Sequence, residues 1–505
     1  ARQNTEISSP AFADTDHVRF QLDGKLSTIP AYSVTGNTLV GNCRSVWAQR
    51  ITGAQVGDYY LFGTHSRLYA EKNSTLYNIT PLTATTQNLG TDPIDIVNTS
   101  SEVSVNFTDI GVDNVVGDRI KLLLLTTVGN ITASLLNAEH IITEIVGPNE
   151  VKIDVGTAAT STASGGATIQ YQIAAGNATQ VTASGMGAGD FGGGDYGGGG
   201  TSTTGQQLYP RIWSFDKFGN DVVMCAGDRA AGDGQKIFLW DGDITSAPTV
   251  LANAPTDCNW VMVVNNSIVA LCGTTVKIGA IGAGTTWSGL LYREKTLERI
   301  DIAHSGFRHG DKNAIIHYGN GVILLKFVGG ADIWDLSDLF EDDGVIAPMA
   351  TARLNQDLIW RGRTGFYLYD GGIVRRIPNT QNEDWIIKNI NESTVWHSFA
   401  YVDTENQEVY LHFPTGTEAE PSDYVIMGNG DFTLGKMDRT AAQRPQALNS
   451  TFYLVDTATV YRHLTRGVFD ANWYAETSYF FANGERRFRI DQIMPDVNQS
   501  GTITV

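Results

Sequence analysis

This 505-residue sequence has few cysteines and prolines, 4 and 14 respectively, and no long apolar run. The cysteines are Cys43, Cys225, Cys258 and Cys272. They lack CxxC spacing and have no histidine at metal-ligand intervals, which favours small buried side chains in a reduced compartment. No stretch reaches the roughly 18 apolar residues of a membrane helix, and no signal peptide is recognisable at Ala1. We therefore expect no integral membrane span and synthesis in a cytoplasm.

Basic side chains are also scarce, because 35 Lys and Arg stand against 54 Asp and Glu and give a formal charge of −19. A protein that adheres along a phosphate backbone normally presents a Lys/Arg-rich face, so this balance argues against a reader of DNA. It does not argue against a conduit, since an acidic wall lets a duplex slide without sticking. Both interpretations of the acidity stay open.

Glycine and short β-type runs are abundant, with 54 glycines and 10% aromatic residues, so we expect many strands, tight turns and little helix. Residues 56–81 predict a meander of three strands. The pattern returns at residues 222–243, 314–337, 358–378, 399–413 and 452–463, the last two being weaker copies. In the copy at 358–378, Tyr369, Asp370 and Gly371 predict a turn between two strands. Such units cannot bury their apolar faces alone, which indicates an all-β chain with a β-propeller.

Composition shifts divide the chain into five parts. Residues 1–88 hold an N-terminal segment and the first meander, and residues 89–182 predict an inserted small β-domain of five or six strands. A Gly-rich tract at 183–206 is typical of a flexible linker. Residues 207–466 carry the main blades, and 467–505 predict a terminal, platform-like docking segment. The sequence stops within an alternating pattern at Val505, so we expect that further residues follow. One helical turn is predicted at 335–343.

Candidate catalytic and metal-binding groups are weak. Acidic residues at 332–335 around Trp334, and at 341–343, are compatible with glycosidase carboxylates, but Trp-Asp turns are common in propeller blades. His304 and His309 lie five apart on a predicted loop, without the spacing of a helical metal site. Four aspartates in Gly-rich loops lack the EF-hand pattern and favour solvated turns. They are Asp228, Asp233, Asp241 and Asp243. We expect no enzyme activity, no catalytic residue, no cofactor and no bound metal.

A basic hairpin near the end of the sequence is the one concentrated positive spot. It contains Arg486, Arg487 and Arg489 beside the apolar residues Ile490, Ile493 and Met494. A solvated edge strand with charged residues is one interpretation. A docking surface is the other, because arginine forms bidentate pairs with carboxylates of a partner.

Four segments, in this order, resemble the tail nozzle proteins of short-tailed, podovirus-like bacteriophages. They are FGTHSRLYAEKNSTLYNITP, an inserted domain ending in AATSTASGGATIQYQI, a Gly-rich linker before LYPRIWSFDKFGNDVVMCAGD, and GERRFRIDQIMPD. The resemblance covers most of the chain. It implies a structural virion protein of the phage tail, built on a propeller.

The same resemblance implies a homohexameric ring below the portal and adaptor, which retains packaged DNA and conducts it during ejection. Its partners would be copies of itself, the tail adaptor protein, and tail fibre or spike proteins, with double-stranded DNA passing transiently through an acidic channel. Two alternatives stay open. One is a propeller-type adhesin or depolymerase for host glycans, and the other is a monomeric propeller scaffold.

Overall fold

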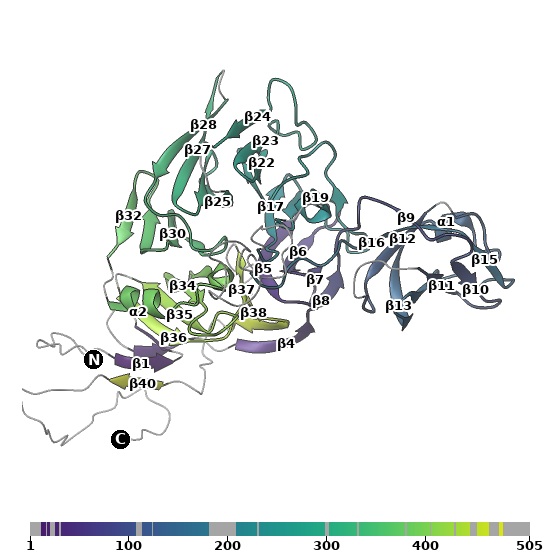
Figure 1. Cartoon of the computed structure of the whole chain (residues 1–505), viewed down its shortest axis with the longest axis horizontal. Coiled ribbons are helices and arrows are strands. Elements are labelled where there is room, and N and C mark those ends of the chain that lie inside the picture. Colours follow the sequence, from purple (N-terminus) through teal and green to yellow (C-terminus); the bar gives the residue numbers. More distant parts are fainter. Residues whose placement is uncertain are drawn as a thin grey trace, which may run out of the picture.

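The protein is described by a computed structural model that covers most of the chain. The described residues are 12–16, 18–20, 26–29, 32–107, 114–123, 125–180, 209–229, 232–297, 302–330, 333–378, 381–404, 406–428, 431–444, 452–463 and 474–477. Within them the fold is nearly all β, as predicted: a β-propeller with an inserted β-domain and a small sheet formed by terminal strands (Figure 1). The Gly-rich linker and the basic hairpin lie outside the described residues.

Seven four-stranded blades make up the described ring: five separate sheets and the two halves of an eight-stranded sheet. Blade 1 consists of β5 (Cys43–Ile51), β6 (Gly57–Thr64), β7 (Leu68–Lys72) and β8 (Thr75–Asn78). Blade 2 consists of β17 (Ser214–Phe218), β18 (Asp221–Cys225), β19 (Ile237–Trp240) and β20 (Thr249–Val250). Blade 3 consists of β21 (Trp260–Val264), β22 (Ser267–Cys272), β23 (Thr275–Ile278) and β24 (Arg293–Thr296). In each blade the first of these strands is the inner one.

The next three blades follow the same order along the chain. Blade 4 consists of β25 (Ala303–His309), β26 (Asn313–Tyr318), β27 (Gly321–Gly329) and β28 (Ile333–Phe340). Blade 5 consists of β29 (Thr351–Leu354), β30 (Asp357–Arg361), β31 (Phe366–Tyr369) and β32 (Val374–Ile377). Blade 6 consists of β33 (Phe399–Asp403), β34 (Glu408–Phe413), β35 (Asp423–Gly428) and β36 (Asp431–Lys436). The predicted turn after Tyr369 is confirmed between β31 and β32.

Blade 7 is assembled from both ends of the propeller sequence. It consists of β37 (Ala441–Arg444), β38 (Phe452–Asp456), β39 (Thr459–His463) and, as its outer strand, β4 (Tyr32–Thr38). β4 pairs antiparallel with β39, and β37 pairs in parallel with β5 at Gln443 and Val46. The N-terminal part of the chain therefore shares a sheet with the last blade, so the propeller is built from both sides of the insertion.

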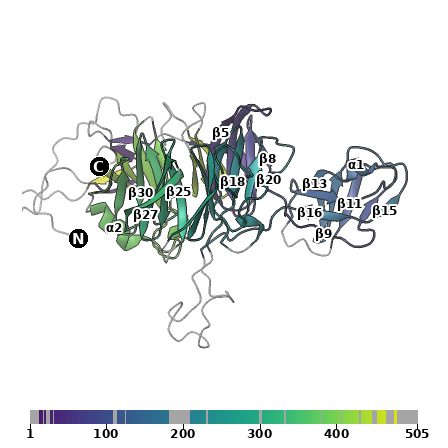
Figure 2. The ribbon, with the colours of Figure 1, turned by 90° about the horizontal axis from the view of Figure 1, so that it is seen from above.

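The insertion connects β8 to β17 and has a hydrophobic core of its own. Its eight-stranded sheet, with the order β15-β10-β11-β14-β13-β12-β16-β9, has more strands than the five or six predicted. The strands are β9 (Gln87–Asn88), β10 (Ile94–Ile96), β11 (Glu102–Asn106), β12 (Arg119–Leu123), β13 (Glu139–Gly147), β14 (Glu150–Asp154), β15 (Ala163–Gly165) and β16 (Thr168–Tyr171). A short helix, α1 (Ala133–Leu136), precedes β13. Figure 2 shows that this domain projects from the side of the ring.

The remaining elements lie around blades 2, 5 and 6. They are two paired strands, β1 (Phe12–Asp16) with β40 (Tyr474–Thr477), a hairpin of β2 (Val18–Phe20) and β3 (Leu26–Thr28), the helix α2 (Gln381–Asn389), and two 3-10 turns, Asp233–Gln235 and Val395–His397. Both β1 and β2 contact β36 of blade 6. Strands from near the two ends of the chain thus meet beside one blade (Figure 1).

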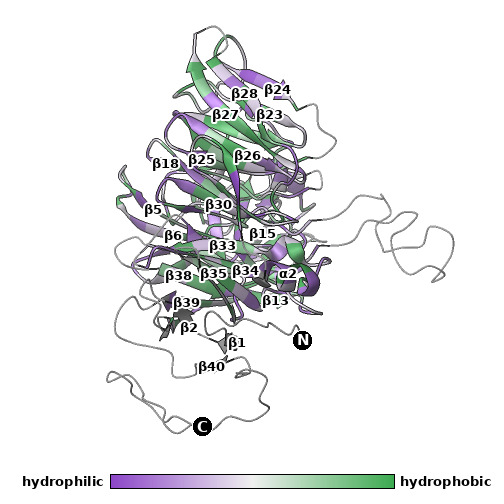
Figure 3. Cartoon of the chain, turned by 90° about the vertical axis from the view of Figure 1, so that its left-hand side faces the viewer, coloured by the Kyte–Doolittle hydropathy of each residue, from purple (hydrophilic) through white to green (hydrophobic). Residues whose placement is uncertain are grey.

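Buried aromatic side chains fill the spaces between the blades. Trp213, Trp240 and Trp360 are each no more than 2% exposed. Trp213 and Trp240 belong to one core cluster, and Trp360 belongs to another. Apolar residues dominate the interior strands of the ring, whereas polar residues also occupy outer strands such as β24 (Figure 3). Burial of both faces of each blade against its neighbours explains this distribution, since a single blade could not shield its own faces.

Blade 3 is absent from the six repeats predicted from the sequence. Its β21 and β22 are buried along their entire length, so the apolar residues run continuously and do not alternate. A signal was nevertheless present, because the two strands are separated only by Asn265 and Asn266, which both have positive φ. Asn at both central positions suits the two-residue hairpin turn that matches strand twist.

The predicted helical turn at 335–343 is wrong. Most of this segment belongs to β28, where Leu336 pairs with Leu325 and Trp334 pairs with Phe327 of β27. The helix preference of a few apolar residues stabilises the segment less than the complete set of backbone hydrogen bonds that it forms with the neighbouring strand β27. The helix that does form, α2, lies between blades 5 and 6 and was not predicted.

Gly63 of β6 provides a test of how the first two blades pack. A Cβ atom at Gly63 would lie 2.5 Å from Cδ1 and 2.7 Å from Cβ of Trp213, which is fully buried. We expect Gly63→Ala to lower the free energy of unfolding by about 1–3 kcal/mol through overpacking. Chemical unfolding followed by tryptophan fluorescence measures this change. Gly147→Ala in β13, where the added Cβ meets nothing within 4 Å, is the control, and an equal effect in both variants would contradict this packing.

Candidate functional site: the connection face of the propeller

The connection face is the side of the ring from which the chain passes between blades. It comprises the residues that precede each inner strand and the turns between the second and third strands of each blade. The insertion leaves from it between β8 and β17, and α2 leaves from it between β32 and β33. The opposite side carries short turns such as Asn73-Ser74 and Asn265-Asn266. The elements that distinguish this propeller are therefore concentrated on the connection face, where loops carry function on a rigid scaffold.

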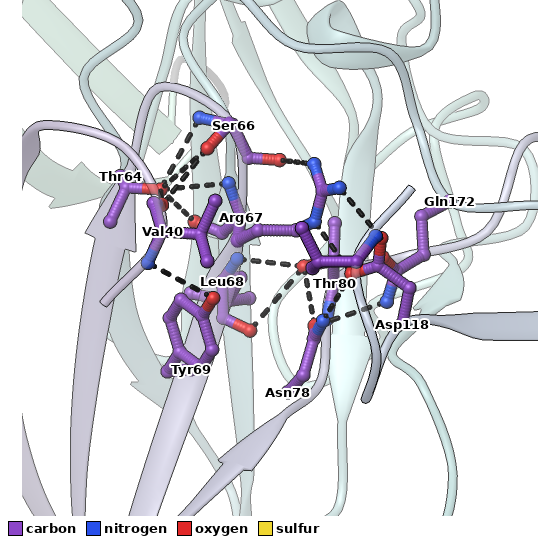
Figure 4. Close-up of polar contacts among 11 residues, drawn as sticks. Val40, Thr64, Ser66, Arg67, Leu68, Tyr69, Asn78, Thr80, Asp118 and Gln172 are labelled. Carbon is purple, nitrogen blue, oxygen red and sulfur yellow. Dashed lines mark hydrogen bonds and ion pairs between the residues drawn. The ribbon is translucent and has the colours of Figure 1, made fainter. Parts of the chain in front are cut away.

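A buried ion pair fastens the insertion to blade 1 (Figure 4). Arg67 follows the turn after β6, and its Nε and Nη2 donate to Oδ1 and Oδ2 of Asp118 at 2.7 and 2.6 Å. The two side chains are 3% and 4% exposed. Asn78 Nδ2 donates to the same carboxylate at 2.8 Å. This bidentate geometry fixes the orientation of the two domains as well as their distance.

Arg119, the next residue along the insertion, connects to blades 1 and 2. Its Nε donates to the carbonyl of Asn78 at 2.7 Å, and its Nη2 donates to the carbonyl of Ile244 at 2.7 Å. Its Nη1 pairs with Glu139 at 2.9 Å, and Glu139 accepts the backbone N–H of Ala247 at 2.9 Å. The insertion is thus held by two blades and projects as a fixed arm.

The segment that returns from the insertion crosses the connection face and is held by two buried arginines. Arg44 Nη2 donates to the carbonyl of Ala178 at 2.9 Å, and Arg211 Nη2 donates to the carbonyl of Ala174 at 2.7 Å. The backbone N–H of Gly176 also donates to the carbonyl of His65 at 2.7 Å. Residues 173–178 therefore belong to the rigid part of the ring.

Each of these arginines is neutralised by a carboxylate from another turn of the same face. Arg44 forms a bidentate pair with Glu420, which lies before β35 of blade 6, and Arg211 pairs with Asp228. Glu420 also lies 3.6 Å from Nδ1 of His397. Removing one member of a pair would leave the other as an unpaired buried charge, which is costly.

A small recess lies on this face close to the propeller axis. It is lined by Pro210, Ile212, Gly227, Arg229, Asn259, Trp260, His304, Pro348 and Trp396. The Arg229 guanidinium stacks over the rings of Tyr209 and Trp396 at 4.9 and 5.7 Å. The recess has a volume of about 10 Å³, which is room for about one water molecule, and its lining contains no carboxylate. It therefore lacks the paired acids that glycoside hydrolysis requires.

Among the described residues, the predicted acidic candidates lie in different surroundings. Asp343 is 2% exposed and accepts hydrogen bonds from the backbone N–H groups of Arg363 and Thr364. Asp335 is exposed on β28, and Asp332 lies outside the described residues. Asp343 thus serves as a turn cap in blade 5.

The predicted metal candidates are also separated. His304 packs on Trp396, whereas His309, at the other end of β25, packs on Tyr369. The expectation that both histidines lie on a loop is wrong, because both belong to that strand. Asp228 and Asp233 lie between β18 and β19 and pair with Arg211 and Lys236. Asp241 and Asp243 lie in the turn after β19 and bind backbone N–H groups there.

One donor cluster that the sequence spacing did not indicate forms in space. Three or more His, Cys, Asp or Glu side chains whose metal-binding atoms lie close together could hold a metal ion. In the part of the chain that the structure describes, one such group forms, and it consists of Asp257, Cys258 and Cys272. The interface candidates Arg486, Arg487, Arg489, Ile490, Ile493 and Met494 lie outside the described residues. Their assignment stays a prediction.

Three buried histidines of blades 4 and 6 each have a depressed pKa. Burial, with a smaller contribution from His304, lowers the pKa of His317 to about 3. Burial and the nearby Arg439 lower the pKa of His412 to about 3. Burial and Arg44 lower the pKa of His397 to about 4. All three are therefore neutral in the folded protein near neutral pH.

Comparisons with known proteins place the chain in no family. No known family matches the sequence, and no curated protein does. Solved structures that resemble it include the computationally designed Ika8 protein, at 10% identity and a TM-score of 0.35, covering 85% of this chain and 98% of that chain. AztD from Citrobacter koseri follows at 8% identity and 0.33, covering 83% and 98%. BamB from Moraxella catarrhalis has 11% identity and 0.31, covering 58% and 93%. No helix among the described residues has the length and apolar character needed to cross a membrane.

Breaking the joint between the insertion and blade 1 should destabilise the protein. We expect Arg67→Met to cost about 3–5 kcal/mol, because it leaves the Asp118 carboxylate buried without its cation. Chemical unfolding measures the loss, and limited proteolysis should show faster cleavage where the insertion meets the ring. Lys152→Met, which removes the exposed Lys152–Glu144 pair of the same domain, is the control. Equal resistance of both variants to unfolding and protease would refute the role of this pair.

Stability should fall as the pH drops from about 6.5 toward 4. The unfolded histidines take up protons in this range while the three buried ones do not, so each lowers the free energy of unfolding by about 1.4 kcal/mol per pH unit. His412→Phe, in a site stacked on Phe399 at 4.8 Å, should make the decline shallower in unfolding titrations between pH 7 and 4. His309→Gln is the control, because this side chain is only partly buried. An unchanged slope for His412→Phe would contradict the buried neutral form.

Proposed function

We propose that this chain is a structural virion protein of a short-tailed phage, forming a ring-shaped tail nozzle below the portal and adaptor. The observation that carries the proposal is where the segments of the resemblance lie. FGTHSRLYAEKNSTLYNITP contains the end of β6 and all of β7 and β8, and LYPRIWSFDKFGNDVVMCAGD leads through β17 and β18. These segments contact each other, since Trp213 Nε1 donates to the carbonyl of Thr64 at 3.0 Å.

The same segments supply the residues that hold the insertion and its return. Arg67 of the first segment pairs with Asp118, and Arg211 of the second pairs with Asp228 and binds the carbonyl of Ala174. The resemblance is to propeller proteins with an inserted domain, and in this chain the insertion is held to the ring as a fixed arm. A fixed arm suits a component that keeps its shape while neighbouring subunits and the tail assemble around it.

The charge of the chain supports the conducting part of the proposal. With −19 per chain, a ring of six copies would present a predominantly acidic channel. Like charges cost little when both surfaces are hydrated and separated by more than about 8–10 Å of salt solution. They also remove the phosphate contacts that would stall a moving duplex. Retention of DNA would then come from a constriction and not from electrostatic attraction.

Docking to the adaptor and to fibres or spikes is assigned, within this proposal, to the terminal region that contains Arg486, Arg487 and Arg489. The described strands nearest to that region are β1 and β40, which pair with each other beside blade 6, where β1 contacts β36. Arg486, Arg487 and Arg489 themselves lie outside the described residues. The glycan-binding or depolymerase alternative receives less support, since the axial recess is small and lined without carboxylates.

Sedimentation of the purified chain tests the proposal. We expect a species of six times the mass of a single chain, alone or with the adaptor, and weak binding of duplex DNA at physiological salt. Triple charge reversal of Arg486, Arg487 and Arg489 to Glu should weaken association while leaving the propeller folded. Reversal of Arg50, Lys295 and Arg375, three exposed cations of the ring, is the matched control.

Three results would overturn it: a monomer that never joins a ring or tail, tight binding of duplex DNA, or release of sugars from host surface glycan. The last result would instead favour the depolymerase.

A further inference from the structure

Two cysteine thiols meet at one end of blade 3. Cys258 precedes β21 and Cys272 ends β22, and their Sγ atoms are 2.9 Å apart. Non-bonded heavy atoms normally pack at about 3.5–4.0 Å. Both cysteines are in the free thiol form, so this contact joins two reduced sulfur atoms closer than ordinary packing requires.

The pair has one buried and one slightly accessible member. Cys258 is fully buried, whereas Cys272 is 6% exposed. Cys225 of blade 2 is also close, since its Sγ lies 3.5 Å from the carbonyl of Cys258. Cys43, by contrast, lies in blade 1 and contacts the carbonyl of Ser45. The protein thus offers one thiol pair and one distant buried thiol for comparison.

A metal ion fits this cluster poorly. Asp257 supplies the third donor, and its atoms and the two sulfurs lie within 4.8 Å of one another. However, Lys277 Nζ binds both carboxylate oxygens, at 2.9 and 3.0 Å. A divalent cation would have to displace this ammonium group, and structural zinc sites use four protein ligands. The cluster therefore favours sulfur chemistry over coordination.

We propose that Cys258 and Cys272 form an oxidation site, which a hydroperoxide converts from two thiols into a disulfide across blade 3. Cys272, the more accessible thiol, attacks one peroxide oxygen. An S–O bond forms, the O–O bond breaks, and the departing hydroxide takes the thiol proton as water. Cys258 then attacks the Cys272 sulfur, forming the S–S bond, while the hydroxyl group leaves with the Cys258 proton as a second water. The two thiols are oxidised and the peroxide is reduced.

The disulfide would join the connection that enters β21 to the end of β22. At present backbone hydrogen bonds close this end of the hairpin, including that from the N–H of Asn259 to the carbonyl of Leu271 at 2.8 Å. A covalent link there restrains the unfolded chain and so stabilises the blade. The inference does not depend on the nozzle proposal, because it concerns thiols within one blade.

Peroxide treatment of the full-length, fully reduced protein tests this. Hydrogen peroxide is added, quenched, and the remaining thiols are counted in denaturant, while peptide mass spectrometry without reductant locates any disulfide. We expect two of the four thiols to be lost, a Cys258–Cys272 peptide to appear, and the melting temperature to rise until dithiothreitol reverses it. Cys43→Ser, the matched control, should lose the same two thiols.

Cys258→Ser and Cys272→Ser should each abolish the disulfide and the rise in melting temperature. If either variant folds poorly, the peptide map of the oxidised wild-type protein still shows whether Cys258 and Cys272 are joined. Retention of all four thiols would overturn the proposal. So would a disulfide that uses Cys225, or oxidation of Cys272 only to sulfinic acid. Incubation with zinc chloride followed by gel filtration provides a further test, because stoichiometric zinc that protects both thiols would show a metal site instead.

Discussion

Closure of the ring by strands from both ends of the propeller sequence is the constraint on which the other features depend. Without β4 beside β39, blade 7 would have only three strands, and without β37 beside β5, the sheet would not join blade 7 to blade 1. Arg439 seals this junction, because its guanidinium lies 4.1 Å from the ring of Tyr32 on β4 and 4.3 Å from that of Tyr461 on β39. Stacking on both rings favours this cation where water is excluded.

A closed ring permits a whole domain to be inserted between two blades. Blades 1 and 2 are held by the circle and by Trp213, so the connection between them need not supply their alignment. The insertion has its own core, and the buried pair of Arg67 and Asp118 determines how it sits on the ring. Buried ion pairs often contribute little net stability but specify one arrangement. Here the arrangement is a rigid arm, and that is the property the proposed nozzle would use.

The connection face unites features that are unrelated in sequence. The return from the insertion, the Arg44–Glu420 pair, the axial recess and the thiol pair all lie at the ends of strands on this side. Strand ends and connections can vary without disturbing the sheets, which explains why polar and reactive groups collect there. The short Asn turns on the other side leave little room for comparable groups.

The class of fold could be predicted from the sequence because strands, hairpins and their turns depend on neighbouring residues. Tyr369-Asp370-Gly371 and the meander at 56–81 have the local pattern that the structure contains. Blade 3 was not predicted because its strands are buried on both faces and so lack the alternation of apolar and polar residues. Most of the segment at 335–343 forms a strand because it pairs with β27. The candidate site was harder still. Its contacts depend on which surfaces the closed ring brings together. Examples are the pair of Arg67 with Asp118 and the contact of Cys258 with Cys272. Another is the hydrogen bond from Thr35 to Val460, two residues that are 425 positions apart. Local sequence determined that the chain forms blades; ring closure decided which strands and side chains meet, because those contacts exist only after distant segments have packed.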